Sequence, residues 1–386
     1  MPSTRALDPR IWLLAIGTFA VGTDAFVIAG ILPLLAAYFV ISMPAAGMIV
    51  SVYSFTYGLG TPLLAVLVAR WRRPQVVVAT LCAFALVNLG CAFAPSYGVL
   101  LGLKAAAGIC AAIYTPTAYL LAASLAPTSR RGAALSAVAV GLTVASVLGI
   151  PIGTWIGYHF GWHATFGAIA LVTVGAAAAI RLGRLRDPGA GAAMPSLARR
   201  IAPLGRWPVW LALLPCLLMY IGNAMVFTYI ALLLETHYSA GELPLLLGVY
   251  GLGGLVGSPL GGRLADRMGP VKPLFMGLTL LLLVHLSVPF SLASIWTTCA
   301  VLFFATMGNW GCFAPFQARI MRIEPENATV LIALINTGVY MGNAIGAGIG
   351  ALLLRAMPVT DLPFVAAGVI ATGIAVLALS LPERRG

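Results

Sequence analysis

The amino-acid sequence predicts an all-α membrane protein with twelve transmembrane helices in two six-helix halves, related by a pseudo-two-fold axis along the membrane normal. Three observations point to this fold. The 386 residues are 61% hydrophobic and only 8% charged, whereas soluble chains contain about 25% charged residues. Apolar runs of about 18 residues or more recur along the chain, and each can cross a hydrocarbon core of roughly 30 Å. The second half of the chain repeats the first.

The apolar runs are expected to be helices, because backbone polar groups in a bilayer core must be satisfied within the spanning segment. In chain order the spans cover 11–36, 46–68, 76–94, 99–124, 132–157, 164–181, 208–234, 244–265, 274–292, 295–318, 328–354 and 363–381. Short polar breaks separate them, so each helix reverses the direction of the previous one. The even number of spans places both termini on the same side of the membrane.

The basic residues give the orientation, because cytoplasmic loops of membrane proteins carry an excess of Lys and Arg. Twenty of the 22 lie in alternate breaks on one side: Arg5 and Arg10; Arg70, Arg72 and Arg73; Arg130 and Arg131; six arginines between 181 and 206; Arg263, Arg267 and Lys272; Arg319 and Arg322; Arg384 and Arg385. The opposite side holds Arg355. We therefore expect a multi-pass protein of the cell (inner) membrane with both termini in the cytoplasm. The net charge of +12 reflects this topology and not a nucleic-acid partner.

The chain divides into an N-terminal half (1–181), a cytoplasmic linker (182–207) and a C-terminal half (208–386). The linker is the one long stretch rich in Pro, Gly, Ser and Arg. An offset of 197 residues superposes the halves: Val52, Tyr53, Gly60, Pro62 and Leu63 match Val249, Tyr250, Gly257, Pro259 and Leu260, and Gly141, Gly149, Ile152 and Gly153 match Gly338, Gly346, Ile349 and Gly350. Transporters built from such repeats bind substrate at the midplane and rock one half against the other.

Four sequence features recur in one known family. They are the loop Gly262-Arg-Leu-Ala-Asp266-Arg267-Met-Gly269-Pro-Val-Lys272, the fifth-span run from Gly141 to Gly149-Ile-Pro151-Ile-Gly153, the first-span run Gly22-Thr-Asp24-Ala-Phe26, and the eleventh-span run from Asn336 to Gly350. Over essentially its full length the chain resembles the major facilitator superfamily, specifically its twelve-helix drug:proton antiporter branch with the arabinose-type, purine/nucleoside and chloramphenicol efflux permeases. The resemblance implies the major facilitator fold, with the first and fourth helices lining a central cavity.

The loop with Gly262, Asp266, Arg267, Gly269 and Lys272 is similar to the family's gating motif. Asp266 can cap or pair at helix ends, Gly269 permits a tight turn, and Arg267 and Lys272 can pair across the cytoplasmic face. A plain basic turn is the alternative. The first-half copy departs from the motif, with Ala69 in place of the aspartate and Arg72 in place of the glycine, so the gate is expected mainly in the second half.

The fifth-span residues Gly141, Gly149, Pro151 and Gly153 resemble the family's antiporter motif. Glycines spaced by four residues let helix backbones approach closely. Close packing alone explains these glycines about as well as a mechanical role does, and the Pro151 kink favours the mechanical role.

Asp24 and Lys104 are the candidate proton-coupling residues. Each is a charged residue inside an apolar run, where ionisation costs roughly 2.5–3.5 kcal/mol on insertion scales. We expect Asp24 to bind the proton and Lys104 to stabilise its ionised form; a static pair that satisfies two buried charges is the alternative. Helix rise places Asp24 about 18 Å and Lys104 about 8 Å from the outer ends of their spans, so contact requires an inward-reaching lysine or a bridge.

Aromatic and amide residues on the inner helices are candidates for the substrate cavity, because such faces hold flat molecules by stacking and hydrogen bonds. These candidates are Phe26, Tyr220, Asn223, Phe227, Asn309, Trp310, Asn336, Tyr340 and Asn343. Each can equally serve helix packing. Ile221 and Val301 stand at the repeat positions of Asp24 and Lys104, so proton chemistry is expected in the first half only.

No metal site or cofactor is expected. His159 and His163 have an i, i+4 spacing without a third ligand, which favours an interfacial anchor with Trp162. The sequence has no nucleotide-binding loop and no metalloprotease or nucleophile-elbow motif, so an enzyme or an ATP-driven pump is not expected.

We expect a monomeric, proton-coupled secondary-active exporter of small organic molecules in the lipid bilayer, with drugs or purine- or nucleoside-like metabolites as substrates. Sugar export or uptake by proton symport is the alternative within transporters. A non-transporting membrane sensor is the alternative from another class.

Overall fold

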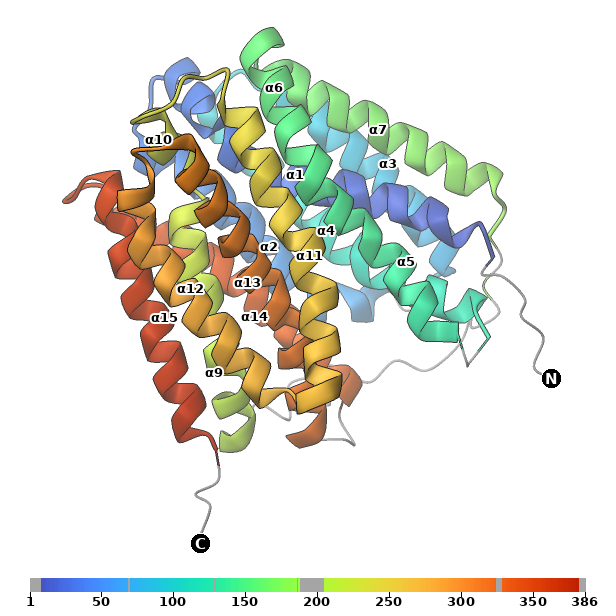
Figure 1. Cartoon of the computed structure of the whole chain (residues 1–386). Helices are drawn as coiled ribbons and strands as arrows, with labels where there is room; N and C mark the ends of the chain where they lie inside the picture. The colour runs from blue at the N-terminus through green and yellow to red at the C-terminus, as the bar shows by residue number, and fades with distance from the viewer. Residues whose placement is uncertain are drawn as a thin grey trace, which may run out of the picture.

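The structure is a computed structural model that describes residues 8–68, 70–127, 130–185, 187, 205–323 and 328–381. The described part is helical, and its helices form one bundle (Figure 1). Eleven helices among these residues are long and apolar enough to cross a membrane, and α2 supplies the twelfth span in the chain order. Ala69 and most of the predicted linker, 182–207, lie outside the described residues.

Six spans form each half. The N-terminal half contains α1 (Ile11–Tyr38), α2 (Met43–Val68), α3 (Arg73–Ala92), α4 (Tyr97–Leu125), a fifth span made of α5 (Arg131–Val144), the π-helix η2 (Ala145–Gly149) and α6 (Ile150–Phe160), and α7 (Trp162–Leu182). The C-terminal half contains α9 (Trp207–Phe227) continued by α10 (Ile230–Glu235), α11 (Leu243–Met268), α12 (Val271–Ser291), α13 (Ile295–Ile323), α14 (Ala328–Leu353), the 3-10 turn η5 (Val359–Asp361) and α15 (Leu362–Leu379).

All twelve predicted spans agree with these helices to within five residues at either end. The largest difference is the end of α13, which continues past the apolar run to Ile323. Arg319 lies in this extension and is only 5% exposed. Its guanidinium donates to the carbonyl of Leu211 at 3.4 Å and to the hydroxyl of Ser380. The helix therefore extends where neighbouring helices satisfy its charged side chain.

The end of the bundle at which α1 begins and α15 ends is called the terminal face below, and the other end, with the turn between α1 and α2, the distal face. Between the distal face and the middle of the bundle the halves touch. The joining pairs are Tyr158 with Glu235, Gly47 with Tyr229, Gly30 with Leu247, Gly251 with Ser146, and Tyr57 with Tyr340. Towards the terminal face the ribbons of the two halves diverge (Figure 1).

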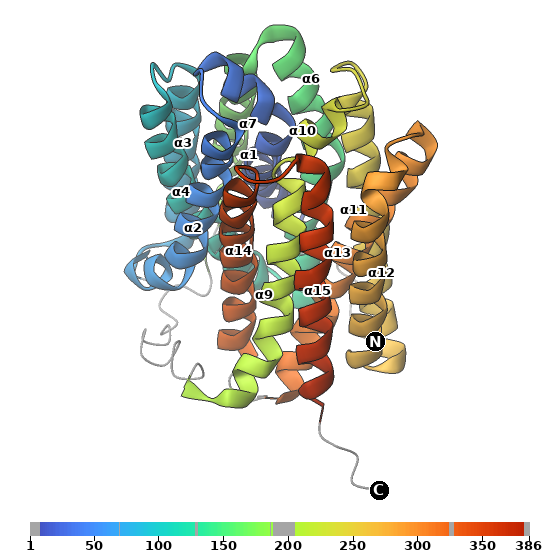
Figure 2. The same cartoon turned by 90° about the vertical axis from the view of Figure 1, so that its left-hand side faces the viewer.

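The helix α14 makes one of the main contacts between the halves, because it lies between α2 and α9 (Figure 2). Its side chain Tyr340 stacks on Tyr57 of α2 near the middle of both helices, with ring centroids 3.6 Å apart. A Cβ added at Gly58, the next residue of α2, would lie 3.2 Å from the backbone nitrogen of Met341. The two backbones thus approach closely in the same place.

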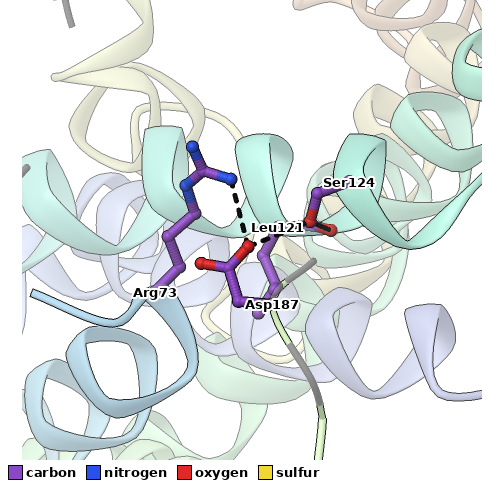
Figure 3. Close-up of polar contacts among 4 residues, drawn as sticks. All are labelled: Arg73, Leu121, Ser124 and Asp187. Atoms are coloured by element: carbon purple, nitrogen blue, oxygen red, sulfur yellow. Dashed lines mark hydrogen bonds and ion pairs between the residues drawn. The ribbon is translucent and has the colours of Figure 1, made fainter. Parts of the chain in front are cut away.

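An aspartate anchors the chain after α7 to the terminal face of the N-terminal half (Figure 3). The carboxylate of Asp187 pairs with Arg73 at the start of α3 at 3.2 Å. It also accepts from the Ser124 hydroxyl in the last turn of α4 at 3.5 Å. The Asp187 side chain is only 5% exposed, so it ties the first described residues of the predicted linker to two helices.

Candidate functional site

The buried charges of the N-terminal half form a direct ion pair. The Lys104 ammonium on α4 donates to Oδ1 of Asp24 on α1 at 2.5 Å, and both side chains are 0% exposed. The sequence had placed the two residues at different depths, and the long lysine side chain closes that difference without a bridging group. Removing two ions from water costs several kcal/mol each, which only close pairing offsets.

Aromatic rings surround the lysine end of the pair. The Lys104 nitrogen lies 4.7 Å from the ring centroid of Phe166 on α7 and 5.6 Å from that of Tyr53 on α2. Both distances allow cation–π attraction. Cys91 on α3 and Cys110 on α4 are also close enough for electrostatic interaction with the pair. These neighbours come from four helices of the N-terminal half, so the pair lies in the interior of that half.

Two buried polar atoms beside the ion pair have no hydrogen-bond partner among the described residues. They are the second carboxylate oxygen of Asp24 and the hydroxyl of Tyr53. A buried polar atom without a partner costs about 1–3 kcal/mol, so such atoms in a native site call for an explanation. A carboxyl that gains a proton becomes a donor. The site can therefore rearrange its hydrogen bonds when Asp24 is protonated.

A separate aromatic cluster lies between the two halves. The Phe26 ring of α1 meets Phe227 of α9 and Trp310 of α13 edge to face, each with centroids 6.5 Å apart. Phe227 in turn stacks on Tyr250 of α11 at 4.9 Å. The cluster thus joins one helix of the N-terminal half to three helices of the C-terminal half.

Two buried amides lie on the helices that carry Phe227 and Trp310. Asn223 and Asn309 are each 7% exposed, and the Oδ1 atom of Asn309 has no hydrogen-bond partner among the described residues. The hydroxyl of Tyr250 faces Asn223 and Thr306. Uncharged aromatic rings and amides at a junction of helices can hold a small molecule by stacking and a few oriented hydrogen bonds.

The predicted cavity residues therefore separate into groups. Phe26, Phe227 and Trp310 come together, and Asn223 and Asn309 are buried on the same helices as Phe227 and Trp310. Tyr340 instead stacks on Tyr57 across the halves. Tyr220 is buried within the C-terminal half, where its Cβ lies against Gly342 of α14. Asn336 and Asn343 are half-buried on α14.

Sequence reasoning missed the tyrosines Tyr53, Tyr57 and Tyr250 as site residues. A signal for two of them was present, because Tyr53 and Tyr250 are matched by the 197-residue repeat. Tyr53 lies beside the ion pair, and Tyr250 belongs to the aromatic cluster. The repeat thus places equivalent tyrosines in the charged interior of one half and at the aromatic site of the other.

The glycines of the fifth span pack inside the N-terminal half. A Cβ at Gly141, Gly149 or Gly153 would meet Thr18, Thr23 or Val27 of α1, respectively. The π-helix η2 ends two residues before Pro151, and π-bulges are frequent at functional sites. The span is therefore both closely packed and irregular at its middle, and its mechanical role stays a prediction.

The gating loop has the tight turn that the sequence predicts. Gly269 ends α11 with a φ of +78°, a conformation that glycine adopts without strain. Among the described residues, Asp266, Arg267 and Lys272 form no salt bridge. The pairing of these charges across the face stays a prediction, as does the part of Gly262.

The two histidines of the distal turn make separate contacts. His163 stacks on Trp162 at 3.7 Å, and its Nδ1 lies 2.7 Å from the carbonyl of Ala92. His159 lies 2.9 Å from the carbonyl of Trp155. Across the part of the chain that the structure describes, no group of His, Cys, Asp or Glu could hold a metal ion.

Comparison with known proteins agrees with this architecture. The family model described as Major Facilitator Superfamily matches residues 14–322 and 216–386. The inner membrane transport protein YdhP of Escherichia coli (strain K12) is 30% identical over 96% of this chain and 95% of its own. A chloramphenicol resistance protein of Streptomyces lividans is 32% identical over 67% of each chain, and a probable sugar efflux transporter of Pasteurella multocida is 27% identical over 89% of this chain and 84% of its own.

A solved structure has the same fold. A bacterial homologue of the human lysosomal transporter Spinster, in an inward-facing and occupied conformation, superposes with a TM-score of 0.76 at 17% identity over 96% of both chains. The family match covers most of the chain, and the twelve helices form the two halves that this fold requires. The chain belongs to the major facilitator superfamily and is a multi-pass membrane transporter, not an enzyme.

Proposed function

We propose that the protein is a proton-coupled exporter that exchanges a small, uncharged, planar organic molecule for protons by alternating access. The observation that carries the proposal is the coexistence of two sites: a fully buried Asp24–Lys104 pair and an aromatic and amide cluster between the halves. A buried ionisable residue in a membrane protein marks an ion or proton pathway by default.

Protonation of Asp24 supplies the driving force in this proposal. In this proposal the carboxylate that is paired with Lys104 is ionised. A proton on Asp24 removes the charge that holds the ammonium, and the freed lysine favours a different packing of the half. A ligand or proton shifts such an equilibrium only if its affinity for the two states differs. In this proposal the difference arises because Asp24 is paired with Lys104 in one state and not in the other.

The proposed orientation has the terminal face in the cytoplasm, as the basic loops of an inner-membrane protein require. The halves touch from the distal face to the middle of the bundle, so the proposed access to the central site is from the cytoplasmic, terminal face. This state, with Asp24 ionised, suits a monomeric exporter that has released its proton inside and awaits substrate. Residues 1–181 and 208–386 would move as the two rocking bodies, with 182–207 as their linker.

The substrate class follows from the side chains of the aromatic cluster. Phe26, Phe227, Tyr250 and Trp310 offer ring faces and edges, and Asn223 and Asn309 offer uncharged hydrogen-bonding groups. Neutral aromatic drugs and purine- or nucleoside-like molecules fit this chemistry. The name of the Streptomyces lividans relative, a chloramphenicol resistance protein, supports export of such a molecule.

Sugar export is the second candidate. Aromatic rings with neighbouring amides also suit a sugar, and a relative at 27% identity bears the name probable sugar efflux transporter. Uptake by proton symport uses the same two sites with the opposite direction of substrate flow.

Reconstitution in liposomes with an internal pH-sensitive dye tests these proposals. Outward-directed gradients of chloramphenicol, a nucleoside or a sugar are applied in turn, and an exporter of the proposed kind moves protons inwards with one of them. Proton flow in the same direction as the substrate would indicate symport. Asp24→Asn should abolish the coupled proton movement, whereas the matched variant Asp361→Asn, in an exposed distal turn, should retain it. Full coupled transport by Asp24→Asn refutes the proposed mechanism.

A further inference from the structure

We infer that Tyr53, Tyr57 and Tyr340 transmit the protonation state of Asp24 to the contact between the two halves. This inference rests on the proposed proton coupling and adds the route by which it acts. A route is needed because the ion pair and the aromatic cluster are separate. Asp24 and Lys104 are both 0% exposed, with rings of the N-terminal half over the lysine, so substrate at the cluster between the halves does not touch the pair in this state.

The first step of the route is Tyr53. Its ring lies 5.6 Å from the Lys104 nitrogen, and its buried hydroxyl has no partner among the described residues. When Asp24 becomes neutral, Lys104 loses its counter-charge, and a buried ammonium needs new acceptors. The ring that lies over the Lys104 nitrogen carries such an acceptor, the Tyr53 hydroxyl, unpartnered among the described residues. Lys104 would donate to this hydroxyl, and the tyrosine side chain would move to receive it.

The second step is the contact between Tyr53 and Tyr57. These residues are one turn apart on α2, and their rings meet edge to face with centroids 6.0 Å apart. Residues four apart lie on the same side of a helix, so a displaced Tyr53 ring presses on Tyr57. The Tyr57 hydroxyl also donates to Thr115 at 2.8 Å. Thr115 belongs to α4, the helix that carries Lys104. The hydrogen bond therefore links Tyr57 of α2 to the helix of the lysine.

The third step crosses between the halves. Tyr57 stacks on Tyr340 of α14 with centroids 3.6 Å apart and planes 19° from parallel. The contact lies where the backbones of α2 and α14 approach closely, at Gly58 and Met341. Packed interfaces exchange between discrete arrangements instead of deforming continuously. A shift of Tyr57 therefore changes the relative stability of the joined and separated states of the two halves at this point.

The groups that can titrate or carry charge beside Asp24 are few. They are Lys104 and Cys110 on α4, Tyr53 on α2 and Cys91 on α3, while α7 contributes the uncharged ring of Phe166. Tyr53 alone among them also contacts the residue that stacks across the halves. Among these described neighbours, only Tyr53 therefore connects Asp24 to α14 through aromatic contacts, by way of Tyr57 and Tyr340.

The test needs no substrate. Spin labels are attached to cysteines placed by Leu182→Cys at the end of α7 and Leu379→Cys at the end of α15, both 80% exposed at the terminal face, with the six native cysteines replaced. The distance distribution between the labels is measured by pulsed electron paramagnetic resonance as the pH is lowered. The infrared band of the protonated carboxyl, assigned by its loss in Asp24→Asn, reports whether Asp24 still titrates.

On acidification, the distance distribution between the two labels should shift in the protein without further substitutions. Tyr53→Phe and Tyr340→Leu should lose this shift, although the infrared band of protonated Asp24 still appears in both. Tyr114→Phe is the matched control, because Tyr114 is another fully buried tyrosine of the same half, whose hydroxyl donates to Leu14. This control should shift like the original protein. If Tyr340→Leu fails to fold, Tyr53→Phe decides alone.

The possible failures are distinguishable. A normal shift in Tyr53→Phe overturns the inference and leaves proton coupling intact, and loss of the shift in Tyr114→Phe as well overturns it by showing a general packing effect. If the original protein does not respond to pH, or if Asp24→Asn responds as it does, the proposed proton coupling fails, and the route fails with it.

Discussion

Asp24 and Phe26 are two residues apart on α1 and belong to different sites: the Asp24 carboxylate pairs with Lys104 inside the N-terminal half, whereas the Phe26 ring meets Phe227 and Trp310 between the halves. Two residues correspond to about 200° of rotation around an α-helix. One helix thus carries the proposed proton-coupling residue on one side and a substrate candidate on the other. This relationship predicts that substitutions at the two sites have separable effects.

The first prediction concerns the stability of the ion pair. Asp24→Asn leaves the Lys104 ammonium buried without its counter-charge, and breaking a buried pair in this way costs about 3–5 kcal/mol. Lys104→Gln should cost a similar amount, because the carboxylate is then unpaired. The double variant should recover much of the loss, since no charge remains to be buried. Thermal unfolding in detergent measures all three, and simple addition of the two single losses contradicts the prediction.

The second prediction concerns the aromatic cluster. Phe227→Ala removes a ring that contacts both Phe26 and Tyr250. An aromatic contact contributes about 0.5–1.5 kcal/mol beyond its buried area, so the dissociation constant of the compound that drives proton movement should rise about three- to ten-fold or more. Equilibrium binding of the radiolabelled compound measures this change. Phe290→Ala, which removes a 75% exposed ring on α12, should bind as before; an equal loss there would show a general defect.

Much of the fold follows from the sequence because the length of each apolar run fixes a membrane span. The resulting helices differ from the predicted spans by at most five residues, and the largest difference is at the end of α13, where Arg319 interrupts the apolar run. Arg319 shows the limit of this reasoning. Its charge predicts a break, yet α13 continues because Leu211 and Ser380 accept its hydrogen bonds. Such acceptors come from other helices and cannot be predicted from local sequence.

The site was predictable in its residue types and not in its contacts. Asp24 and Lys104 stand out because a charge in an apolar run is costly, but rise per residue alone does not reveal that the lysine reaches the carboxylate. Likewise, Tyr340 shares a helix face with Asn336 and Asn343 in the sequence pattern, yet it stacks on Tyr57 of the other half. The rotation of each helix in the bundle decides which face meets which partner, and tertiary packing sets that rotation.

The third prediction concerns the close contact of α11 with the π-helix η2. A Cβ added at Gly251 would overlap the Ser146 carbonyl and lie 2.6 Å from Cα of Val147, both in backbone of the other half. Gly251→Ala should therefore disfavour the joined distal state and raise the reactivity of cysteines introduced on that side. Gly248→Ala is the matched control, because its Cβ would meet Pro151 at an ordinary 3.8 Å. Equal reactivity in the two variants would show that this contact does not hold the halves together.

The fourth prediction concerns a hydrogen bond that closes the distal face. The Tyr158 hydroxyl of α6 donates to Glu235 at the end of α10 at 2.5 Å, across the two halves. The pair is exposed, so we expect a contribution of about 1 kcal/mol to the joined state, which is about a five-fold change in the equilibrium between the states.

A double-variant cycle tests this contribution. Tyr158→Phe and Glu235→Ala should each raise the labelling rate of a cysteine introduced at the distal face, and the double variant should raise it no further, because either substitution already removes the same interaction. Ser239→Ala is the control, since its hydroxyl bonds Glu242 within one turn of the C-terminal half and does not cross between the halves. Independent, additive effects of the two substitutions would show that the residues act separately, and the distal closure would then depend on the packing around Gly251 and Tyr229 instead.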